Sequence, residues 1–249
     1  MALLEKLVII PTYNERENIE AIIDAVMNLQ ANFHVLIIDD GSPDGTATIV
    51  RSLFARYPGQ LFLEERSGKL GLGTAYIHGF RWALARSYQF IFEMDADFSH
   101  NPVDLIRLHE ACVQGADVAV GSRYTKGGNV KNWPFQRVAL SVGASIYTQL
   151  ITWMPVKDPT AGFVCYSRNV LETMRLDNIQ FIGYAFQIEM KFTAWKLGFR
   201  IKEVPITFID RKLGASKMHK SIIKEGIMGV LILRWNSLKK GYINQISRT

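Results

Sequence analysis

Cysteine is scarce in this sequence of 249 residues, and long hydrophobic runs are missing. The two cysteines, Cys112 and Cys165, lie among apolar neighbours without the spacing of a metal site, so we expect buried free thiols, as in a reducing cytosol. The longest uncharged window, residues 138–156, is interrupted by serine, threonine and glutamine, and the apolar run 226–233 is far shorter than the roughly 20 residues that span a bilayer. The first apolar run stops at Pro11, so it is too short for a signal peptide. We therefore expect neither a signal peptide nor a membrane span.

Charged residues are a minority, at 21% against 48% hydrophobic residues, which excludes an intrinsically disordered chain and predicts a globular fold. The length suits one large domain, or one domain with an appendage. The formal net charge of +6 favours anionic partners, such as nucleic acid, a phosphorylated substrate or an anionic membrane surface.

Strand and helix patterns alternate along the chain. The apolar runs 7–10 and 35–38 are typical of strands buried on both faces, and further strand patterns cover 61–66, 90–94 and 117–120. We expect helices over residues 14–29, where Asn14 and Glu17 form a capping pattern, and over 74–87, 101–114, 138–154, 184–197 and 222–238. This order predicts an α/β fold with a mostly parallel central sheet flanked by helices.

Two carboxylates, Asp95 and Asp97, follow the apolar run 90–94. Alternate residues of a strand share a face, so both side chains point to one side and repel each other unless a cation lies between them. Carboxylates bind hard cations such as Mg²⁺ or Mn²⁺, and Mg²⁺ typically completes its shell with substrate phosphates. A solvated, Asp-rich turn is the alternative for these two residues alone. Their place at a strand end, where open α/β sheets bind ligands, favours a metal-diphosphate site.

Two further segments have distinctive patterns. The loop 67–75 contains glycines that allow close approach of a ligand to the backbone, and Lys69 supplies a charge for phosphate, although the loop matches neither a P-loop nor a dinucleotide fingerprint. Residues 138–154 form a helical pattern with an apolar face, which includes Ile146 and Leu150, opposite an uncharged face of serine and threonine. An ordinary packed helix is the favoured interpretation of the second segment, and a membrane-facing helix is the alternative.

Three motifs, in this order along the chain, resemble those of inverting glycosyltransferases of family 2, which have the Rossmann-like GT-A fold. They are VIIPTYNE at 8–15, IDDGS at 38–42 and MDAD at 94–97. More narrowly, the chain resembles polyprenyl-phosphate (dolichyl-phosphate) mannose synthases. The segments that carry this narrower similarity are 68–75, 98–102, 121–124, 132–134 and 216–217. The resemblance implies a single GT-A catalytic domain over residues 1–217, followed by a helical tail over 218–249 that lies in a membrane interface or packs on the domain.

The resemblance implies a donor site for GDP-mannose. The residues that it places at the nucleotide sugar are Pro11, Tyr13, Glu15, Asp39, Asp40, Lys69, Asp95, Ala96, Arg211 and Lys217. The last two belong to a loop that closes over the diphosphate. Asp95 and Asp97 would hold Mg²⁺ or Mn²⁺, and Ser99 is a third candidate ligand because some relatives have glutamine at its position; water is the alternative there.

The resemblance also implies that Arg123 and Arg137, with Ser141, bind the phosphate of a polyprenyl (dolichyl) monophosphate, and that Asp97 and the two arginines are the catalytic residues. A phosphomonoester carries about −1.5 to −2 charges near neutral pH, so it attacks without a strong base. Arginine forks orient it through paired hydrogen bonds, and the metal and the closing loop stabilise the leaving diphosphate. We expect direct displacement at the anomeric carbon with inversion, and no glycosyl-enzyme intermediate.

A polyprenyl tail stays in the bilayer, so the implied enzyme works as a peripheral protein at the cytoplasmic face of a membrane. The segments 138–154 and 222–238 are candidates for the interface, since lysines flank the second of them. Packing of both segments on the domain or on a second subunit is the alternative. A separate membrane-anchoring protein and a homo-oligomer both stay open as partners.

Three other functions compete with this assignment. Glucosyl transfer from UDP-glucose to the same lipid would use the same motifs. A sugar-1-phosphate nucleotidyltransferase would need a glycine-rich basic loop directly after the first strand, where this chain has Pro-Thr-Tyr-Asn-Glu at 11–15. A non-catalytic basic module that binds lipid or nucleic acid would explain the net charge but not the carboxylate pairs at 39–40 and 95–97, so we expect no nucleic-acid partner.

Overall fold

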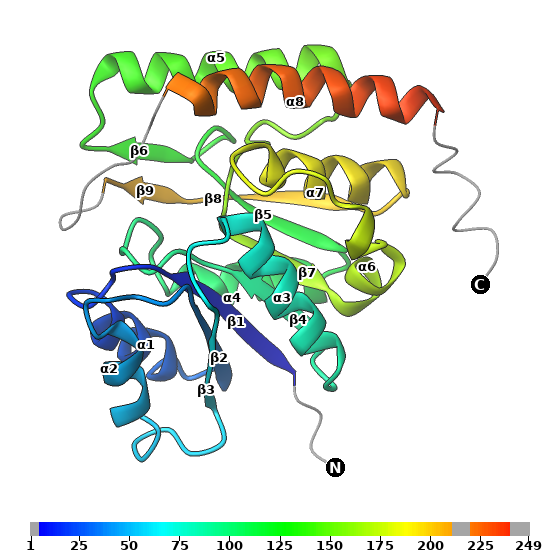
Figure 1. The fold of residues 1–249 in the computed structure, drawn as a ribbon. Coiled ribbons are helices and arrows are strands. Elements are labelled where there is room, and N and C mark those ends of the chain that lie inside the picture. Colours follow the sequence, from blue (N-terminus) through cyan, green and yellow to red (C-terminus); the bar gives the residue numbers. More distant parts are fainter. Residues whose placement is uncertain (1–4, 211–219, 240–249) are drawn as a thin grey trace.

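A central seven-stranded sheet organises the computed structural model of the chain, which describes residues 5–210 and 220–239 (Figure 1). Its strands are β1 Lys6–Thr12, β2 Phe33–Asp39, β3 Leu61–Glu65, β4 Phe90–Glu93, β5 Val118–Ser122, β7 Val164–Ser167 and β8 Ile201–Pro205. They are ordered β3-β2-β1-β4-β7-β5-β8. Within this sheet β7 runs antiparallel to β4 and β5, and the other neighbours pair in parallel. The predicted α/β class with a mostly parallel sheet is confirmed.

Helices cover both faces of the sheet. They are α1 Ile19–Met27, α2 Thr46–Ser52, α3 Leu72–Leu84, α4 Asp104–Val113, α5 Phe135–Thr152, α6 Arg168–Thr173, α7 Ala185–Lys196 and α8 Lys220–Lys239, with a 3₁₀ turn at Leu176–Asn178. Successive residues of β1 point to opposite faces. Val8 and Ile10 pack in one buried cluster with α1 and α4, whereas Leu7 and Ile9 pack in a second cluster with α3 and α7. The sheet is therefore buried on both sides, as its continuous apolar runs indicate.

A second layer lies beside the carboxyl-terminal edge of the sheet. The short strands β6 Asn129–Lys131 and β9 Thr207–Ile209 pair in parallel, and α5 and α8 lie side by side above them (Figure 1). Buried Val230 and Leu233 of α8 share a third apolar cluster with Ile188 and Phe192 of α7, so α8 is packed on the domain. Helix α8 has the helical structure expected of the tail, and the domain boundary at residue 217 stays a prediction.

Helix α1 begins later than expected. Asn14 adopts a left-handed conformation with φ 60°, and its backbone N–H donates to Ser42 Oγ at 3.0 Å. The backbone N–H of Glu15 likewise donates to Thr46 Oγ1 at 3.1 Å. The prediction that Asn14 caps the helix is wrong, because these contacts tie the segment to the turn after β2, and the helix starts at Ile19.

Helix α5 packs with its polar face toward the domain, which is the reverse of an ordinary amphipathic helix. Its hydroxyl-bearing face is the buried one: Ser145, Thr148 and Thr152 are at most 2% exposed, while Leu150 is 69% and Trp153 70% exposed. The buried hydroxyls donate to backbone carbonyl oxygens four residues earlier, at 2.6 to 3.0 Å. These small side chains therefore pack without unsatisfied polar atoms. An apolar helix face is left on the surface.

Two other expectations concern cysteines and membrane spans. Cys112 and Cys165 are buried free thiols, as predicted. None of the helices in the described ranges is long and apolar enough to cross a membrane.

Candidate functional site

Loops from β1, β2, β4 and β5 meet at one edge of the sheet, because these strands run in the same direction and carry their carboxyl ends there. Asp39, the last residue of β2, is fully buried at this edge. Its carboxylate accepts hydrogen bonds from Thr12 Oγ1 at 2.8 Å, from Ser42 Oγ at 2.6 Å and from the Ser42 backbone N–H at 2.9 Å. Asp39 thus fixes the turn after β2 against the end of β1, and its neighbours Pro11 and Asp40 come to the same edge.

Asp40 is paired with Arg66, a residue that the sequence analysis did not single out. Arg66 Nε and Nη2 lie 2.7 and 2.5 Å from Asp40 Oδ1, and both side chains are 9% exposed. Arg66 Nη1 also donates to Thr74 Oγ1 at 2.8 Å. Asp40 and Arg66 therefore hold the glycine loop in place. A lone arginine after a strand carries no recognisable signal in the sequence.

Tyr13 and Lys69 line the open side of these loops. Lys69 Nζ lies 5.0 Å from the centroid of the Tyr13 ring, within the range of a cation–π contact. Lys69 is exposed, whereas Tyr13 and Glu15 are half-buried. Six of the expected donor residues therefore lie at one edge of the sheet, with the ammonium of Lys69 on the solvent side: Pro11, Tyr13, Glu15, Asp39, Asp40 and Lys69. Arg211 and Lys217 lie outside the described residues.

The Asp-x-Asp segment follows β4. Asp97 Oδ1 accepts a hydrogen bond from the Ser99 backbone N–H at 3.0 Å, and Phe98 between them has φ 58°. Ser99 is 2% exposed, and its hydroxyl has no partner among the described residues. Ala96 is buried beneath the turn. Backbone strain of this kind at a bulky residue is found at ligand sites.

The donor set at this turn fits a hard divalent cation. Asp95 and Asp97 supply carboxylate oxygens, and the orphaned Ser99 hydroxyl supplies a neutral oxygen. No group of three or more His, Cys, Asp or Glu side chains placed to hold a metal occurs in residues 5–210 or 220–239. A cation here would therefore need ligands from a substrate or water. Burial first, and then the charges of Asp95 and Glu93, raise the pKa of Tyr76 well above its usual value, so a neutral phenol lies beneath the carboxylates.

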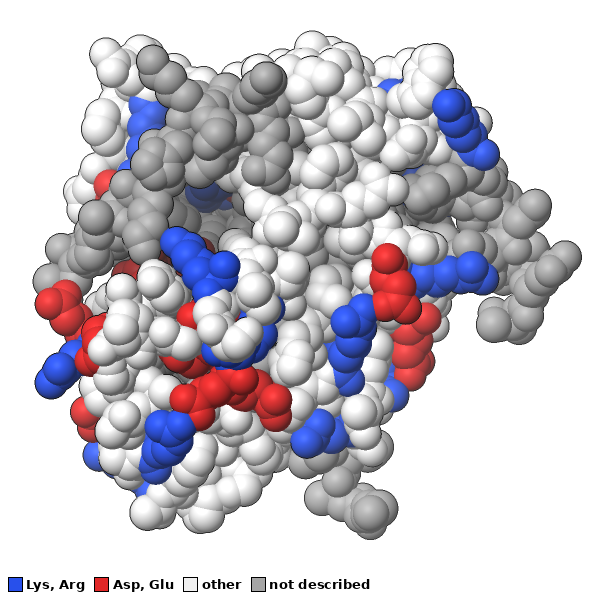
Figure 2. Space-filling view, viewed as in Figure 1, with Lys and Arg blue, Asp and Glu red and all other residues white. Residues whose placement is uncertain are grey.

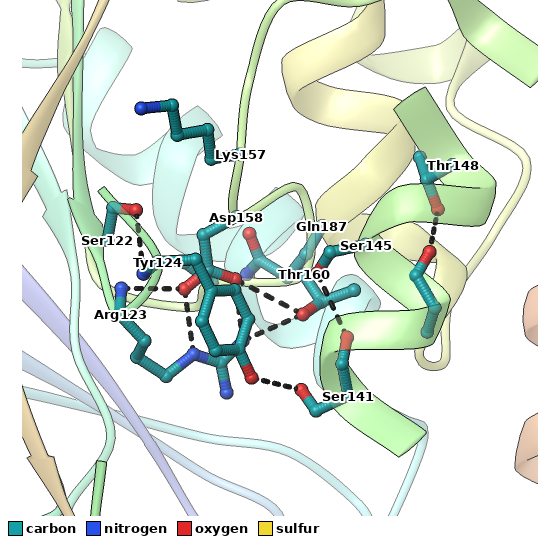
Figure 3. Close-up of polar contacts among 12 residues, drawn as sticks. Ser122, Arg123, Tyr124, Ser141, Ser145, Thr148, Lys157, Asp158, Thr160 and Gln187 are labelled. Atoms are coloured by element: carbon teal, nitrogen blue, oxygen red, sulfur yellow. Dashed lines mark hydrogen bonds and ion pairs between the residues drawn. The ribbon is translucent and has the colours of Figure 1, made fainter. Parts of the chain in front are cut away.

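Arg123 follows β5 and is held by the buried carboxylate of Asp158 (Figure 3). Its Nε and Nη2 donate to the two carboxylate oxygens at 2.7 and 2.6 Å, and Nη2 also donates to Thr160 Oγ1 at 2.8 Å. Burial lowers the pKa of Arg123, but the hydrogen bonds and charge of Asp158 outweigh it and raise the pKa above its ordinary value. The guanidinium is therefore a permanent, fixed cation. Of its nitrogens, Nη1 has no acceptor among the described residues.

Arg137 and Ser141 lie one turn apart at the start of α5. Arg137 Nη1 donates to both carboxylate oxygens of Asp210, at 2.9 and 3.0 Å. Ser141 Oγ accepts a hydrogen bond from the Tyr124 hydroxyl at 2.7 Å (Figure 3). Because Tyr124 adjoins Arg123, the structure brings the three expected acceptor-binding residues together. The carboxylate partners of the two arginines were missed, since they are distant in sequence.

A buried polar network lies behind Arg123. The ammonium of Lys191 donates to the Ala161 carbonyl oxygen at 2.6 Å and to Gln187 Oε1 at 3.0 Å, and Gln187 Nε2 donates to Glu93 at 2.9 Å. Burial lowers the pKa of Lys191 and raises that of Glu93, and each charge partly offsets the shift of the other. The network connects β4 to the loop that carries Asp158.

His100 directly follows the turn at residues 95–99, and the charges of both Asp97 and Arg123 act on its imidazole. Its ring stacks on Phe163 with centroids 4.8 Å apart, and Nδ1 has no partner among the described residues. Burial lowers the pKa of His100 to about 4, against an opposing effect of Asp97. The imidazole is therefore neutral near pH 7 and acts as a packing group.

The family model described as Glycosyl transferase family 2 matches residues 7–175. The chain belongs to glycosyltransferase family 2. Two relatives are similar over most of its length. A polyprenol monophosphomannose synthase of Mycolicibacterium smegmatis is 46% identical over 224 residues, covering 90% of this chain and 84% of the relative. An undecaprenyl-phosphate mannosyltransferase of Micrococcus luteus is 43% identical over 237 residues, covering 94% and 97%.

Solved structures of glycosyltransferases share the fold. Glucosyl-3-phosphoglycerate synthase from Mycobacterium tuberculosis, in complex with Mn²⁺, UDP and glucosyl-3-phosphoglycerate, has a TM-score of 0.66 at 19% identity, covering 92% of this chain and 79% of that chain. A mannosyltransferase from Pyrobaculum calidifontis, in complex with GDP-mannose and Mn²⁺, has a TM-score of 0.57 at 17% identity, covering 94% and 73%. Because both identities are below 25%, this similarity shows the fold alone, which is the GT-A fold.

Proposed function

We propose that the protein transfers mannose from GDP-mannose to the phosphate of a polyprenyl (dolichyl) monophosphate. One observation supports this acceptor most strongly: α5 carries Arg137 and Ser141 at its start and an exposed apolar face along its length. A substrate with an anionic head and a lipid tail matches both features of the same helix. The similarity to a polyprenol monophosphomannose synthase and to an undecaprenyl-phosphate mannosyltransferase supports the same acceptor class and favours mannose over glucose.

The donor would lie over the ends of β1, β2 and β4. Tyr13 and Lys69 flank the opening, and Asp39 and Asp40 hold its loops. Asp95 and Asp97, with Ser99 or water, would hold Mg²⁺ or Mn²⁺. A divalent cation bound there supplies a positive charge for the departing diphosphate. We place Pro11, Glu15 and Ala96 in the same site, where Arg211 and Lys217 would add positive charge.

The acceptor phosphate would be oriented by Arg123 and Arg137. A phosphate oxygen then forms a bond to the anomeric carbon as the bond from that carbon to the donor diphosphate breaks, which inverts the configuration and releases GDP. The acceptor is already anionic near neutral pH, so no protein base is needed. Asp158 holds Arg123 at 2.6 to 2.7 Å, so little side-chain freedom remains to be lost at the transition state.

We further propose that the exposed apolar face of α5 and α8 rests on a membrane. The face consists of Phe135, Leu140, Ile146, Leu150, Trp153, Ile227, Met228, Leu231, Ile232, Trp235 and Leu238, each at least 40% exposed. In Figure 2 the uncovered upper middle of the molecule, where these helices lie, is white, with Lys and Arg side chains to its left and right. Arg234 stacks on Trp153 at 4.1 Å and Lys239 on Trp235 at 5.1 Å, which pairs cations with indole rings as at a lipid interface. Peripheral binding at the cytoplasmic face would bring α5 to the acceptor.

Donor choice and metal dependence test the proposal. Purified protein is incubated with polyprenyl phosphate and either labelled GDP-mannose or labelled UDP-glucose, with Mg²⁺ or Mn²⁺ and with a chelator as control. We expect label in the lipid fraction from GDP-mannose alone, and its loss on chelation. Label from UDP-glucose would replace the donor assignment. Transfer that persists without a divalent cation would contradict the role of Asp95 and Asp97.

A further inference from the structure

The indole ring of Trp133 contacts both arginines of the proposed acceptor site. The Arg137 guanidinium carbon lies 4.0 Å from the centroid of its ring, and the Arg123 guanidinium carbon lies 5.6 Å from the same centroid. Both distances are within the range of a cation–π contact. The sum of the two distances is also an upper limit on the separation of the guanidinium carbons. Contact with one indole ring therefore limits the separation of the two guanidinium carbons.

The backbone around Trp133 restricts the position of the ring. Asn132 has φ 65°, in the left-handed region, and Pro134 occupies the N-cap of α5 with φ −59°. Proline fixes its own φ and also restricts the residue before it. The backbone of Trp133 thus lies between a residue in the left-handed region and a proline, and the same helix start carries Arg137.

An aromatic row connects Trp133 to the metal turn. The Trp133 and Phe208 rings pack edge to face with centroids 5.2 Å apart, and Phe208 packs on His100 at 5.4 Å. His100 directly follows Ser99, whose carbonyl oxygen accepts a hydrogen bond from the Ile209 backbone N–H at 3.1 Å. The ring of Trp133 is therefore held in a fixed place relative to the turn with Asp95 and Asp97.

We propose that Trp133 is a positioning residue for the acceptor phosphate, whose ring face holds Arg123 and Arg137 at the separation that grips one phosphate. The inference rests on the proposed acceptor. The carboxylates of Asp158 and Asp210 bind one edge of each guanidinium. The Nη1 of Arg123 and the Nε and Nη2 of Arg137 have no acceptor in the part of the chain that the structure describes. The ring face orients these remaining donors without using their hydrogen bonds.

The test compares Trp133→Phe, which keeps a flat ring, with Trp133→Leu, which removes it. Transfer is measured with a short-chain isoprenyl phosphate that needs no vesicle, so that membrane binding does not contribute. We expect Trp133→Leu to raise the acceptor KM about 10- to 100-fold, the loss of one or two cation–π contacts, with less than about a twofold change in the KM for GDP-mannose. Trp133→Phe should restore the acceptor KM to within about threefold of the wild type.

Trp82→Leu is the matched control, because Trp82 also stacks on an arginine, Arg86, at 3.4 Å, near the end of α3 opposite the glycine loop. It should leave both KM values unchanged. If Trp133→Leu does not fold, Trp133→Met, which fills the space without a ring, replaces it. The role of Trp133 would be overturned if Trp133→Leu left the acceptor KM unchanged or raised the donor KM equally. It would also be overturned if Trp133→Phe did not restore the acceptor KM. Absence of transfer by the wild-type protein would instead overturn the proposed function.

Discussion

Replacement of Asp158 by asparagine should destabilise the fold by about 3 to 5 kcal/mol, because it leaves the Arg123 guanidinium buried without a counter-charge. Asp158 is fully buried, and the Arg123 side chain is only 9% exposed, so water does not compensate for the lost carboxylate. Asparagine keeps the size of the side chain, so the change in charge dominates. At about 2 to 4 °C per kcal/mol for a chain of this length, the thermal midpoint should fall by roughly 10 °C.

Urea unfolding of four proteins measures this effect: wild type, Asp158→Asn, Arg123→Met, and the double variant. The double variant should recover most of the loss of Asp158→Asn, because it removes the unpaired charge as well. Asp210→Asn is the matched control. Its partner Arg137 is 24% exposed, so we expect a change within about 1 kcal/mol. The reasoning would be refuted if Asp158→Asn lowered the free energy of unfolding by less than about 1 kcal/mol, or if the double variant were less stable than Asp158→Asn alone.

Two further substitutions test the donor loop and the apolar face. Gly73→Ala should destabilise the protein by about 1 to 3 kcal/mol and raise the KM for GDP-mannose, because an added Cβ would lie 2.8 Å from the Phe186 ring. Gly143→Ala is the control. No atom lies within 4 Å of its added Cβ, so it should lose no stability. Leu150→Glu should reduce cosedimentation with anionic lipid vesicles about tenfold without changing the thermal midpoint, since Leu150 is 69% exposed on α5. Val113→Glu, 63% exposed on α4, should leave vesicle binding unchanged, and equal losses for both glutamate variants would contradict a membrane-facing surface.

Much of the sheet, and the edge at which the expected donor residues gather, could be predicted from the sequence, because both follow from local patterns. Continuous apolar runs mark β1 and β2, and the carboxylates that follow strands identify the edge where parallel strands end. The antiparallel direction of β7 could not be predicted. A run of four residues has the same pattern in either direction, and its pairing with β4 and β5 is set by distant contacts.

The acceptor side was predicted less completely. Arg123 was singled out, but Asp158 lies 35 residues away and pairs with it only in the folded chain. The orientation of α5 was missed for a different reason. A pattern of apolar and polar residues does not reveal that the Thr148 hydroxyl can be buried because it donates a hydrogen bond to a backbone carbonyl oxygen of the preceding turn. The apolar side was therefore taken for the packed side.

The reaction is tested most directly by the configuration of its product. GDP-α-mannose labelled with ¹³C at the anomeric carbon is incubated with polyprenyl phosphate and the protein, and the product is examined by NMR and mass spectrometry. Direct displacement predicts a β-mannosyl phosphate on the lipid, with GDP as the second product and no sugar attached to the protein. An α-linked product, a mannosylated protein, or no mannolipid at all would contradict it.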